Sequence, residues 1–267
     1  MNLKESTVNG SGLMTLFCHP VATFLAALRF LTILPVRWGC HHDGRYFAAS
    51  IFWFPAVGLF IGLAAALVCS GLLMVLPDPV ALLLALLVPI VLSGALHLDG
   101  LADSADGLLS SRPREQILLI MRDSRIGSMG VVVLFAVLLV RFTAIINLPE
   151  SLVLPALILM PLAGRTAILF NMALFPYARA GEGLGRLFYS PESRLAAGWS
   201  CLLLLAAVSS LAPRFIFLVL SGVAVVVLLF GLWCRRKIGG TTGDTLGAVS
   251  ELTETIVVLI MTTLIIV

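Results

Sequence analysis

Long runs of apolar residues, separated by short polar segments, make up most of this chain. Clear examples are VALLLALLVPIVLSGAL at 80–96 and FIFLVLSGVAVVVLLFGLW at 215–233. A helix rises about 1.5 Å per residue, so about 20 apolar residues cross the hydrocarbon core of a bilayer. Applied along the chain, this length predicts spans near 16–36, 47–76, 79–96, 126–147, 152–175, 196–212, 215–234 and 246–267.

The pattern therefore predicts an all-α, polytopic helical membrane protein with seven to eight transmembrane helices. They form one integral membrane domain, 1–267, which begins with an N-terminal tail of 1–15. The first span is the least regular, because His19 and Arg29 interrupt it and Pro35 closes it. An interfacial or re-entrant helix would suit this segment equally well.

Composition agrees with a lipid bilayer as the surroundings of this chain. Hydrophobic residues make up 60% and charged residues 12%, and the mean hydropathy is +1.10. A soluble domain has roughly 45–50% apolar and about 25% charged residues. A water-soluble globule is therefore excluded, and nothing in the sequence suggests a nucleic-acid partner. The sequence leaves a homo-oligomer open.

The basic residues divide unevenly between the two predicted sides of the membrane. The connections after the first, third, fifth and seventh spans hold twelve of the 17 Lys and Arg residues, and the opposite set holds only Lys4 and Arg214. By the positive-inside rule the first set is cytoplasmic, which predicts a bacterial inner-membrane protein whose polar connections face the cytoplasm. The twelve are Arg37, Arg45, Arg112, Arg114, Arg122, Arg125, Arg179, Arg186, Arg194, Arg235, Arg236 and Lys237.

The segment HLDGLADSADG, 97–107, is the richest in candidate chemistry. On a continuing helix, Asp99, Asp103 and Asp106 fall at i, i+4 and i+7 and share one face. Like charges at this spacing repel each other, which favours a bound cation. Oxygen ligands without Cys partners favour Mg²⁺. The alternative is a solvated acidic helix end with an N-capping Asp or Ser.

The segment MRDSRIGSMG, 121–130, begins the next predicted span. Arg122, Asp123 and Arg125 could be a positive-inside anchor. Beside a carboxylate-bound Mg²⁺, however, two guanidinium groups match the oxygens of a diphosphate. Arg112 and Arg114 lie in the same connection but outside this motif, and we expect them to be anchors only.

The segment GGTTGDTLGAVSE, 239–251, precedes the last span. Its glycines and threonines offer backbone N–H groups at a helix N-terminus, which favours anions, although the lysine of a Walker A loop is missing. The alternative is a turn with Asp244 or Thr245 as N-cap. Glu251 and Glu254 should face the bundle interior. The candidate anion-binding residues are Gly239, Gly240, Thr241, Thr242, Gly243 and Asp244.

Arg165 has no charged neighbour within its own span. An intramembrane arginine is expected to pair inward, and the aspartates of 97–107 are candidate partners.

Taken together, these segments resemble the cobalamin synthase family, the adenosylcobinamide-GDP ribazoletransferases. The resemblance covers nearly the whole chain, and HLDGLAD with RDSRIG and GDTLGA is a specific combination. The matching segments are RFLTILPV (29–36), FPAVGLFIG (54–62), HLDGLADSADG (97–107), MRDSRIGSMG (121–130), GR (164–165), ARAGEGLG (178–185) and GGTTGDTLGA (239–248).

The resemblance implies a Mg²⁺-dependent enzyme that transfers the adenosylcobinamide-phosphate moiety of adenosylcobinamide-GDP to α-ribazole or α-ribazole 5′-phosphate and releases GMP. For this chemistry we expect Asp99 and Asp103 to be the leading metal ligands. Asp106 and Asp123 are further ligands or the general base, and His97 is another candidate base. Arg122, Arg125 and Arg165 would stabilise charge, and 239–244 with Glu251 would bind the nucleotide.

Two other functions remain open at this point. A CDP-alcohol phosphotransferase shares the chemistry, but Asp103 replaces the Arg of its DGxxAR start, and the continuation GxxxDxxxD is missing. An ion-coupled transporter would also bury carboxylates, but it is expected to place them near mid-membrane within inverted repeats.

Overall fold

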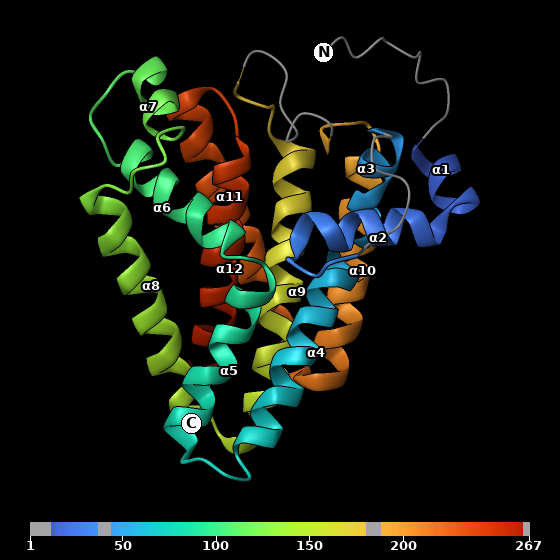
Figure 1. The fold of residues 1–267 in the computed structure, drawn as a ribbon, viewed down its shortest axis with the longest axis vertical. Helices are drawn as coiled ribbons and strands as arrows, with labels where there is room; N and C mark the ends of the chain where they lie inside the picture. Colours follow the sequence, from blue (N-terminus) through green and yellow to red (C-terminus); the bar gives the residue numbers. More distant parts are fainter. Residues whose placement is uncertain (1–11, 37–43, 180–187, 264–267) are drawn as a thin grey trace.

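The computed structural model describes residues 12–36, 44–179 and 188–263, and these fold into a bundle of helices (Figure 1). One isolated β-bridge, between Tyr177 and Thr241, is the only strand pairing within these ranges. The helices are α1 (Gly12–Cys18), α2 (Pro20–Leu31), α3 (Gly44–Ser50), η1 (Ile51–Trp53), α4 (Phe54–Leu72), α5 (Asp78–Leu92), α6 (Leu96–Leu108), α7 (Arg114–Ile120), α8 (Ser128–Ile146), α9 (Glu150–Leu174), α10 (Ser193–Leu211), η3 (Pro213–Phe215), α11 (Ile216–Ile238) and α12 (Gly243–Thr263).

Six stretches of helix are long and apolar enough to cross a membrane in the part of the chain that the structure describes. The bent pair α5 and α6 makes a seventh if it counts as one broken span. The prediction of a polytopic helical membrane protein is confirmed, and of the predicted counts only seven fits. The six are Tyr46–Leu72, Ser128–Ile146, Glu150–Leu174, Ser193–Leu211, Pro213–Ile238 and Gly243–Thr263.

The predicted span at 16–36 is wrong. Helix α2 has 12 residues, about 18 Å of helix, whereas the hydrocarbon core is about 30 Å thick. It lies across one end of the bundle in Figure 1, with α1 and α3 at the same end. Helix α1 therefore lies at the end of the bundle that holds the polar connections. The prediction had placed the N-terminal side of the chain at the opposite end, and it is wrong. Lys4 lies outside the described residues.

The span predicted at 79–96 and the acidic segment 97–107 do not form one continuous helix, since α5 and α6 meet at 86°. Gly94 and Ala95 both have φ near +58°, a left-handed conformation that ends α5. The N–H of Ile33 donates to the carbonyl of Leu92 at 2.8 Å, so the extended segment after α2 satisfies a carbonyl left free by the break. The segment RFLTILPV therefore helps to hold the α5–α6 break.

Helix α9 is the centre of the bundle and packs against α4, α10 and α12 (Figure 1). A Cβ atom at Gly58 would lie 2.6 Å from the carbonyl oxygen of Pro161, and one at Gly62 would lie 2.6 Å from that of Ile158. Small residues four apart let membrane helices approach closely. The segment FPAVGLFIG thus serves the contact of α4 with α9.

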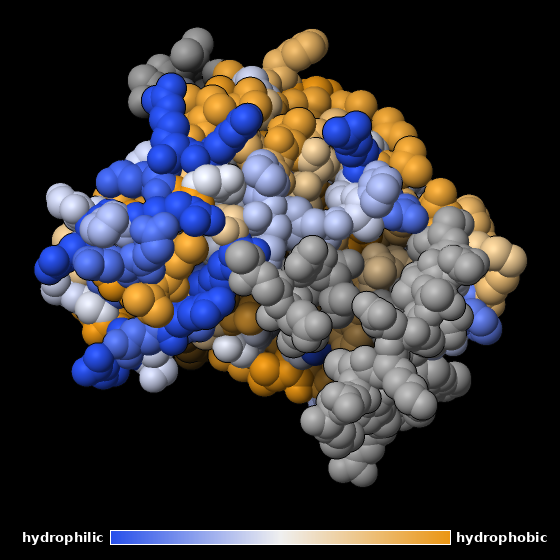
Figure 2. All heavy atoms as spheres, turned by 90° about the horizontal axis from the view of Figure 1, so that it is seen from above, coloured by the Kyte–Doolittle hydropathy of each residue, from blue (hydrophilic) through white to orange (hydrophobic). Residues whose placement is uncertain are grey.

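The two ends of the bundle differ in the way that the basic residues predict. The long connections between α6 and α8 and between α9 and α10 lie at one end, together with the short connection between α11 and α12, whereas the connections at the other end are all short (Figure 1). Figure 2 views the end with the long connections and shows hydrophilic residues gathered over much of it, with hydrophobic residues along parts of its edge. Large apolar side chains such as Phe135, Phe217 and Leu229 are exposed along the outside of the bundle, where lipid would cover them.

Candidate functional site

The candidate site begins where α6 crosses α12. A Cβ atom at Gly100 would lie 2.6 Å from the carbonyl oxygen of Asp244, and one at Gly247 would lie 3.0 Å from that of His97. These glycines therefore permit a backbone contact between the two helices. As a result the start of α12 lies beside the acidic face of α6, and Asp99, Asp103 and Asp244 form a group that we call the acidic rim.

The acidic rim carries more negative than positive charge. The negative charges of Asp99 and Asp244 act on Asp103, and among the described residues the guanidinium group that acts on Asp103 belongs to Arg179. Arg179 Nη2 donates to Asp244 Oδ2 at 2.6 Å, and Thr242 Oγ1 donates to the same oxygen at 3.2 Å. With three carboxylates and one guanidinium, the rim has a formal charge of −2, which favours a bound cation.

The donor set of the rim suits a metal ion that takes few protein ligands. Within residues 12–36, 44–179 and 188–263, no three His, Cys, Asp or Glu side chains are close enough together to hold a metal ion. Asp99 and Asp103, one helical turn apart, remain as a carboxylate pair. Mg²⁺ commonly uses one or two carboxylates and takes its other ligands from water and substrate phosphates, so the pair fits this ion.

Asp106, predicted as a third ligand or a base, has a different role in this structure. Its Oδ2 accepts from the N–H of Gly127 at 2.7 Å, and its Oδ1 accepts from that of Gly130 at 2.9 Å. Gly127 is the N-cap of α8, so Asp106 satisfies donors at the start of this helix and complements its dipole. A Cβ atom at Gly130 would lie 2.6 Å from Asp106 Oδ2, so a larger residue at this position would displace the carboxylate.

Asp123 and Arg125 form an exposed ion pair. Arg125 Nη2 donates to Asp123 Oδ2 at 2.6 Å and Nε donates to Oδ1 at 3.0 Å, so the guanidinium group binds the carboxylate in a fork. This hydrogen bond lowers the pKa of Asp123 to about 2. A carboxylate of that pKa is a weak proton acceptor, so the geometry does not favour Asp123 as the base. Arg122 is exposed.

The segment 239–245 is used mostly for structure. Thr242 caps α12 through a reciprocal pair of hydrogen bonds: its N–H donates to Thr245 Oγ1 at 2.7 Å, and the N–H of Thr245 donates to Thr242 Oγ1 at 3.3 Å. Thr241 exchanges backbone hydrogen bonds with Pro176 and Ala178. The alternative prediction of a capped turn therefore describes this segment, but the predicted N-cap residue, Asp244 or Thr245, is wrong, because Thr242 caps the helix.

Some capacity for anions remains at this helix N-terminus. The backbone of Gly243 and Asp244 forms the first turn of α12, where N–H groups lack helical acceptors. Gly243 is exposed, and a Cβ atom there would meet open space. Gly239, with φ +84°, ends α11, and Gly240 lies against the carbonyl of Pro176. Both of these glycines are explained by backbone packing.

Two arginines at this end have contacts that the sequence did not reveal. Arg114 Nε donates to the carbonyl of Ile238 and Nη2 to that of Ala178, both at 2.7 Å, so Arg114 ties α7 to α11 and to the connection after α9. The expectation that Arg114 is only an anchor is wrong. Arg179, the partner of Asp244, belongs to the segment ARAGEGLG, whose residues 180–185 lie outside the described part. No spacing in the sequence indicates either contact.

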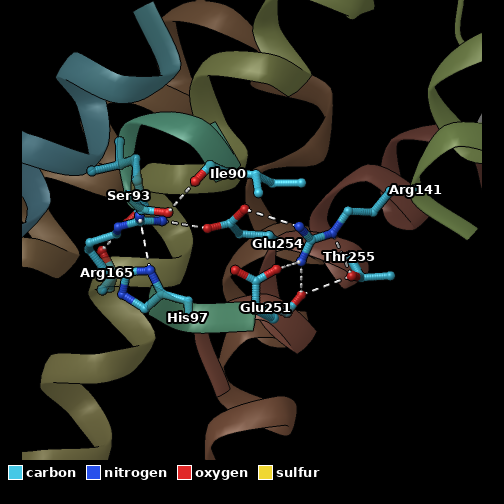
Figure 3. A network of polar contacts seen from close by, with 10 residues as sticks. Ile90, Ser93, His97, Arg141, Arg165, Glu251, Glu254 and Thr255 are labelled. Atoms are coloured by element: carbon cyan, nitrogen blue, oxygen red, sulfur yellow. Dashed lines mark hydrogen bonds and ion pairs between the residues drawn. The ribbon is translucent and has the colours of Figure 1, made fainter. Parts of the chain in front are cut away.

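A buried ion-pair network lies deeper between α6, α8, α9 and α12 (Figure 3). Arg165 Nη1 donates to Glu254 Oε1 at 2.5 Å, and Arg141 Nη2 lies 2.7 Å from Glu251 Oε2. Arg141 Nη1 also reaches Glu254 Oε2 at 3.5 Å, which links the two pairs. Two arginines thus balance two glutamates, and all four side chains are at most 8% exposed.

This network changes the expected roles of two residues. The carboxylate partner of Arg165 is Glu254 and not an aspartate of 97–107, and Gly164 leaves the room for Glu254. Glu251 is held by Arg141, so neither Arg165 nor Glu251 is free for the predicted contact with substrate. The prediction that Glu251 and Glu254 face the interior is confirmed, with 6% and 2% of their surfaces exposed.

His97 is buried and belongs to the same network. Its Nδ1 lies 3.3 Å from Arg165 Nη2. A guanidinium group only donates, so Nδ1 must accept, and the proton of the neutral ring resides on Nε2. His97 is therefore arranged as a hydrogen-bond donor, and a second proton would place an imidazolium beside Arg165. This geometry does not favour His97 as the predicted general base.

A cavity of about 170 Å³ adjoins the rim between α2, α4, α6, α9 and α12. Asp99, Gly100, Gly243 and Asp244 line one side of it, and His97 also contributes. The remaining lining is apolar and comes from Phe30, Leu31, Phe54, Leu96, Ile168, Met172, Phe188 and Leu246, with Gly247. Charged oxygen ligands and an apolar pocket thus share one site.

Comparison with known proteins agrees with this picture. The family model described as cobalamin-5-phosphate synthase matches residues 23–262. The adenosylcobinamide-GDP ribazoletransferase of Pseudomonas putida (strain GB-1) is 44% identical over 243 residues, which cover 88% of this chain and 96% of the relative. That of Brevibacillus brevis is 38% identical over 252 residues, covering 89% and 96%. That of Clostridium acetobutylicum is 34% identical over 230 residues, covering 85% and 90%. No solved structure matches the chain.

Proposed function

The chain belongs to the cobalamin-5-phosphate synthase family, and on that premise we propose that it is an adenosylcobinamide-GDP ribazoletransferase. A ribose hydroxyl of α-ribazole attacks the phosphorus that carries the aminopropanol arm of cobinamide, and GMP leaves. The product is adenosylcobalamin, or its 5′-phosphate when α-ribazole 5′-phosphate is the acceptor. Family membership favours this reaction over a CDP-alcohol phosphotransferase or an ion-coupled transporter.

The observation that carries the proposal is the formal charge of −2 at the acidic rim, beside the first turn of α12 and an apolar cavity. Asp99 and Asp103 would hold Mg²⁺. When bound, this ion supplies the positive charge that neutralises a diphosphate and a leaving GMP. The N–H groups of Gly243 and Asp244, with Arg122, would bind phosphate oxygens.

The proton of the attacking hydroxyl needs an acceptor at the rim. Oδ2 of Asp244 already accepts from Arg179 and Thr242, whereas no hydrogen bond to Oδ1 is found among the described residues. We assign Asp244 Oδ1 as the general base, in place of Asp106, Asp123 and His97. Asp106 is occupied by the start of α8, Asp123 by Arg125, and His97 is arranged as a donor.

The rim would face the cytoplasm of a bacterial inner membrane. The polar end of the bundle carries the basic residues of the described connections, whereas Arg214 lies near the opposite end, in η3. This bias supports a cytoplasmic polar end. Cysteine labelling in intact cells and in inverted vesicles tests it: Ser111→Cys should react only from the inside, and Asp78→Cys only from the outside.

The reaction is tested by release of GMP from adenosylcobinamide-GDP by the purified full-length protein in detergent, with and without α-ribazole and across a Mg²⁺ titration. GMP release that requires both α-ribazole and Mg²⁺ would support the proposal. Release of CMP from a CDP-alcohol, or no reaction of adenosylcobinamide-GDP under any of these conditions, would overturn it.

A further inference from the structure

The cavity beside the acidic rim has an aromatic wall that the phosphoryl chemistry does not use. The rings of Phe30 and Phe188 lie 4.8 Å apart between centroids, those of Phe54 and Phe188 5.5 Å, and those of Phe30 and Phe54 5.9 Å. Such distances are typical of packed aromatic groups. Ile168 and Met172 of α9 complete the apolar lining.

The size of the cavity limits its occupant to one small ring system. Its volume is about 170 Å³. An apolar protein cavity of about 150 Å³ accommodates benzene. A corrin ring is far larger than this space. Guanine is flat but carries several donors and acceptors, and those that face the apolar side chains of the lining would be left unpaired at a cost of roughly 1–3 kcal/mol each.

One polar group of the lining is oriented by the buried network. His97 lines the cavity, and because its Nδ1 accepts from Arg165, its Nε2 carries a proton. The cavity therefore combines an apolar, aromatic wall with the N–H donor of His97, and it opens beside the carboxylates of Asp99 and Asp244. This combination suits a flat aromatic base that has one accepting nitrogen and carries a sugar.

We propose that this cavity binds the dimethylbenzimidazole ring of the ribazole acceptor and so determines the base that the enzyme incorporates. The inference rests on the proposed function. The two ring methyl groups pack among Phe30, Phe54 and Met172, and the unsubstituted ring nitrogen accepts from His97 Nε2. The other ring nitrogen bears the ribose, whose hydroxyl groups then lie at the acidic rim, where the diphosphate is held.

The first test fills the cavity from α9. Met172→Phe should raise the KM for α-ribazole at least tenfold and leave the KM for adenosylcobinamide-GDP within twofold. Leu174→Phe adds the same ring to an exposed position of the same helix and is the control. A folded Met172→Phe protein with an unchanged KM for α-ribazole would overturn the inference while the proposed function stands.

The second test leaves the protein unaltered and varies the acceptor. Removing a methyl group from the benzimidazole should raise KM about fourfold. Replacing the accepting nitrogen by carbon, as in an indole riboside, should raise it about tenfold. Equal KM values for these ribosides and for a purine riboside of the same sugar configuration would overturn the inference. If the unaltered protein releases no GMP with any acceptor, the proposed function fails as well.

Discussion

The acidic rim and the buried ion-pair network use the same residue types and differ in how many positive charges they contain. In the network, Arg141 and Arg165 balance Glu251 and Glu254, and every side chain is buried. At the rim, one arginine of the described part of the chain, Arg179, faces three aspartates. A balanced and buried set is fixed in place, whereas an unbalanced and accessible set can bind a cation and its anionic substrate.

This difference in charge balance distinguishes the structural acidic residues of the network from the proposed catalytic ones of the rim better than their depth in the bundle does. Both sets lie on or beside the same two helices, since α6 carries Asp99, Asp103 and His97, and α12 carries Asp244, Glu251 and Glu254. The network locks α8, α9 and α12 together below the rim. It therefore supports the position of the rim without supplying any reacting group.

Removal of a rim carboxylate should give the largest effect on turnover. We expect Asp99→Asn or Asp103→Asn to lower kcat at least a thousandfold, equivalent to about 4 kcal/mol, because the site then has a single protein ligand for the cation. The apparent midpoint of thermal unfolding should change little. GMP release and thermal unfolding in detergent measure the two quantities, and near-normal turnover of either variant would remove that residue from the metal site.

The network should show the opposite behaviour, a loss of stability. Arg165→Leu leaves Glu254 buried with only the 3.5 Å contact to Arg141, so we expect a loss of roughly 3–5 kcal/mol in the free energy of unfolding. The double variant Arg165→Leu/Glu254→Leu removes both charges and should recover part of this loss.

Denaturant titration in mixed micelles measures these differences. Arg214→Leu, at the opposite end of the bundle, is the control and should change stability by less than about 0.5 kcal/mol. If the double variant lost as much free energy of unfolding as the two single variants, Arg165→Leu and Glu254→Leu, lose together, the balance of charges would not be what stabilises the network.

Arg122, at the polar end of the bundle, is either a phosphate ligand or a topological anchor. A smaller effect on turnover should distinguish these two roles. Arg122 is exposed, whereas Arg125 is bound to Asp123. Arg122→Lys keeps the positive charge but loses the bidentate geometry of the guanidinium group. We therefore expect kcat/KM to fall about tenfold while insertion into the membrane is normal. Arg112→Lys, exposed in the same connection, should have no effect. Equal rates for both variants would make Arg122 an anchor only.

Most of the membrane spans and the polar end of the bundle were predictable because they depend on the length of apolar runs and on the placement of Lys and Arg, both of which are properties of single segments. The break at Gly94 and Ala95 was not, since it depends on Ile33 from a distant segment filling the gap. The position of α2 also depends on contacts with distant segments. The sequence therefore indicated that this segment is irregular but not that α2 lies across one end of the bundle.

The segment 97–107 was predictable as a candidate site, but the separate roles of its three aspartates were not. Spacing put Asp99, Asp103 and Asp106 on one helical face, and spacing cannot tell which carboxylate another helix will occupy. The partners that decide this are the backbone N–H groups of Gly127 and Gly130, which lie more than 20 residues further along the chain. Likewise, the pairing of Arg165 with Glu254 requires α9 and α12 to pack together.

Asp106 gives the smallest effect and the sharpest distinction between a ligand and a cap. Asp106→Ala should lower the free energy of unfolding by about 1 kcal/mol, because two N–H groups at the start of α8 lose their acceptor. Gly130→Ala should have a comparable effect, since its Cβ would displace the same carboxylate. In neither variant should the Mg²⁺ concentration for half-maximal activity change. If raised Mg²⁺ restored the activity of Asp106→Ala, this aspartate would belong with Asp99 and Asp103 among the metal ligands, and its hydrogen bonds to Gly127 and Gly130 would not be its main role.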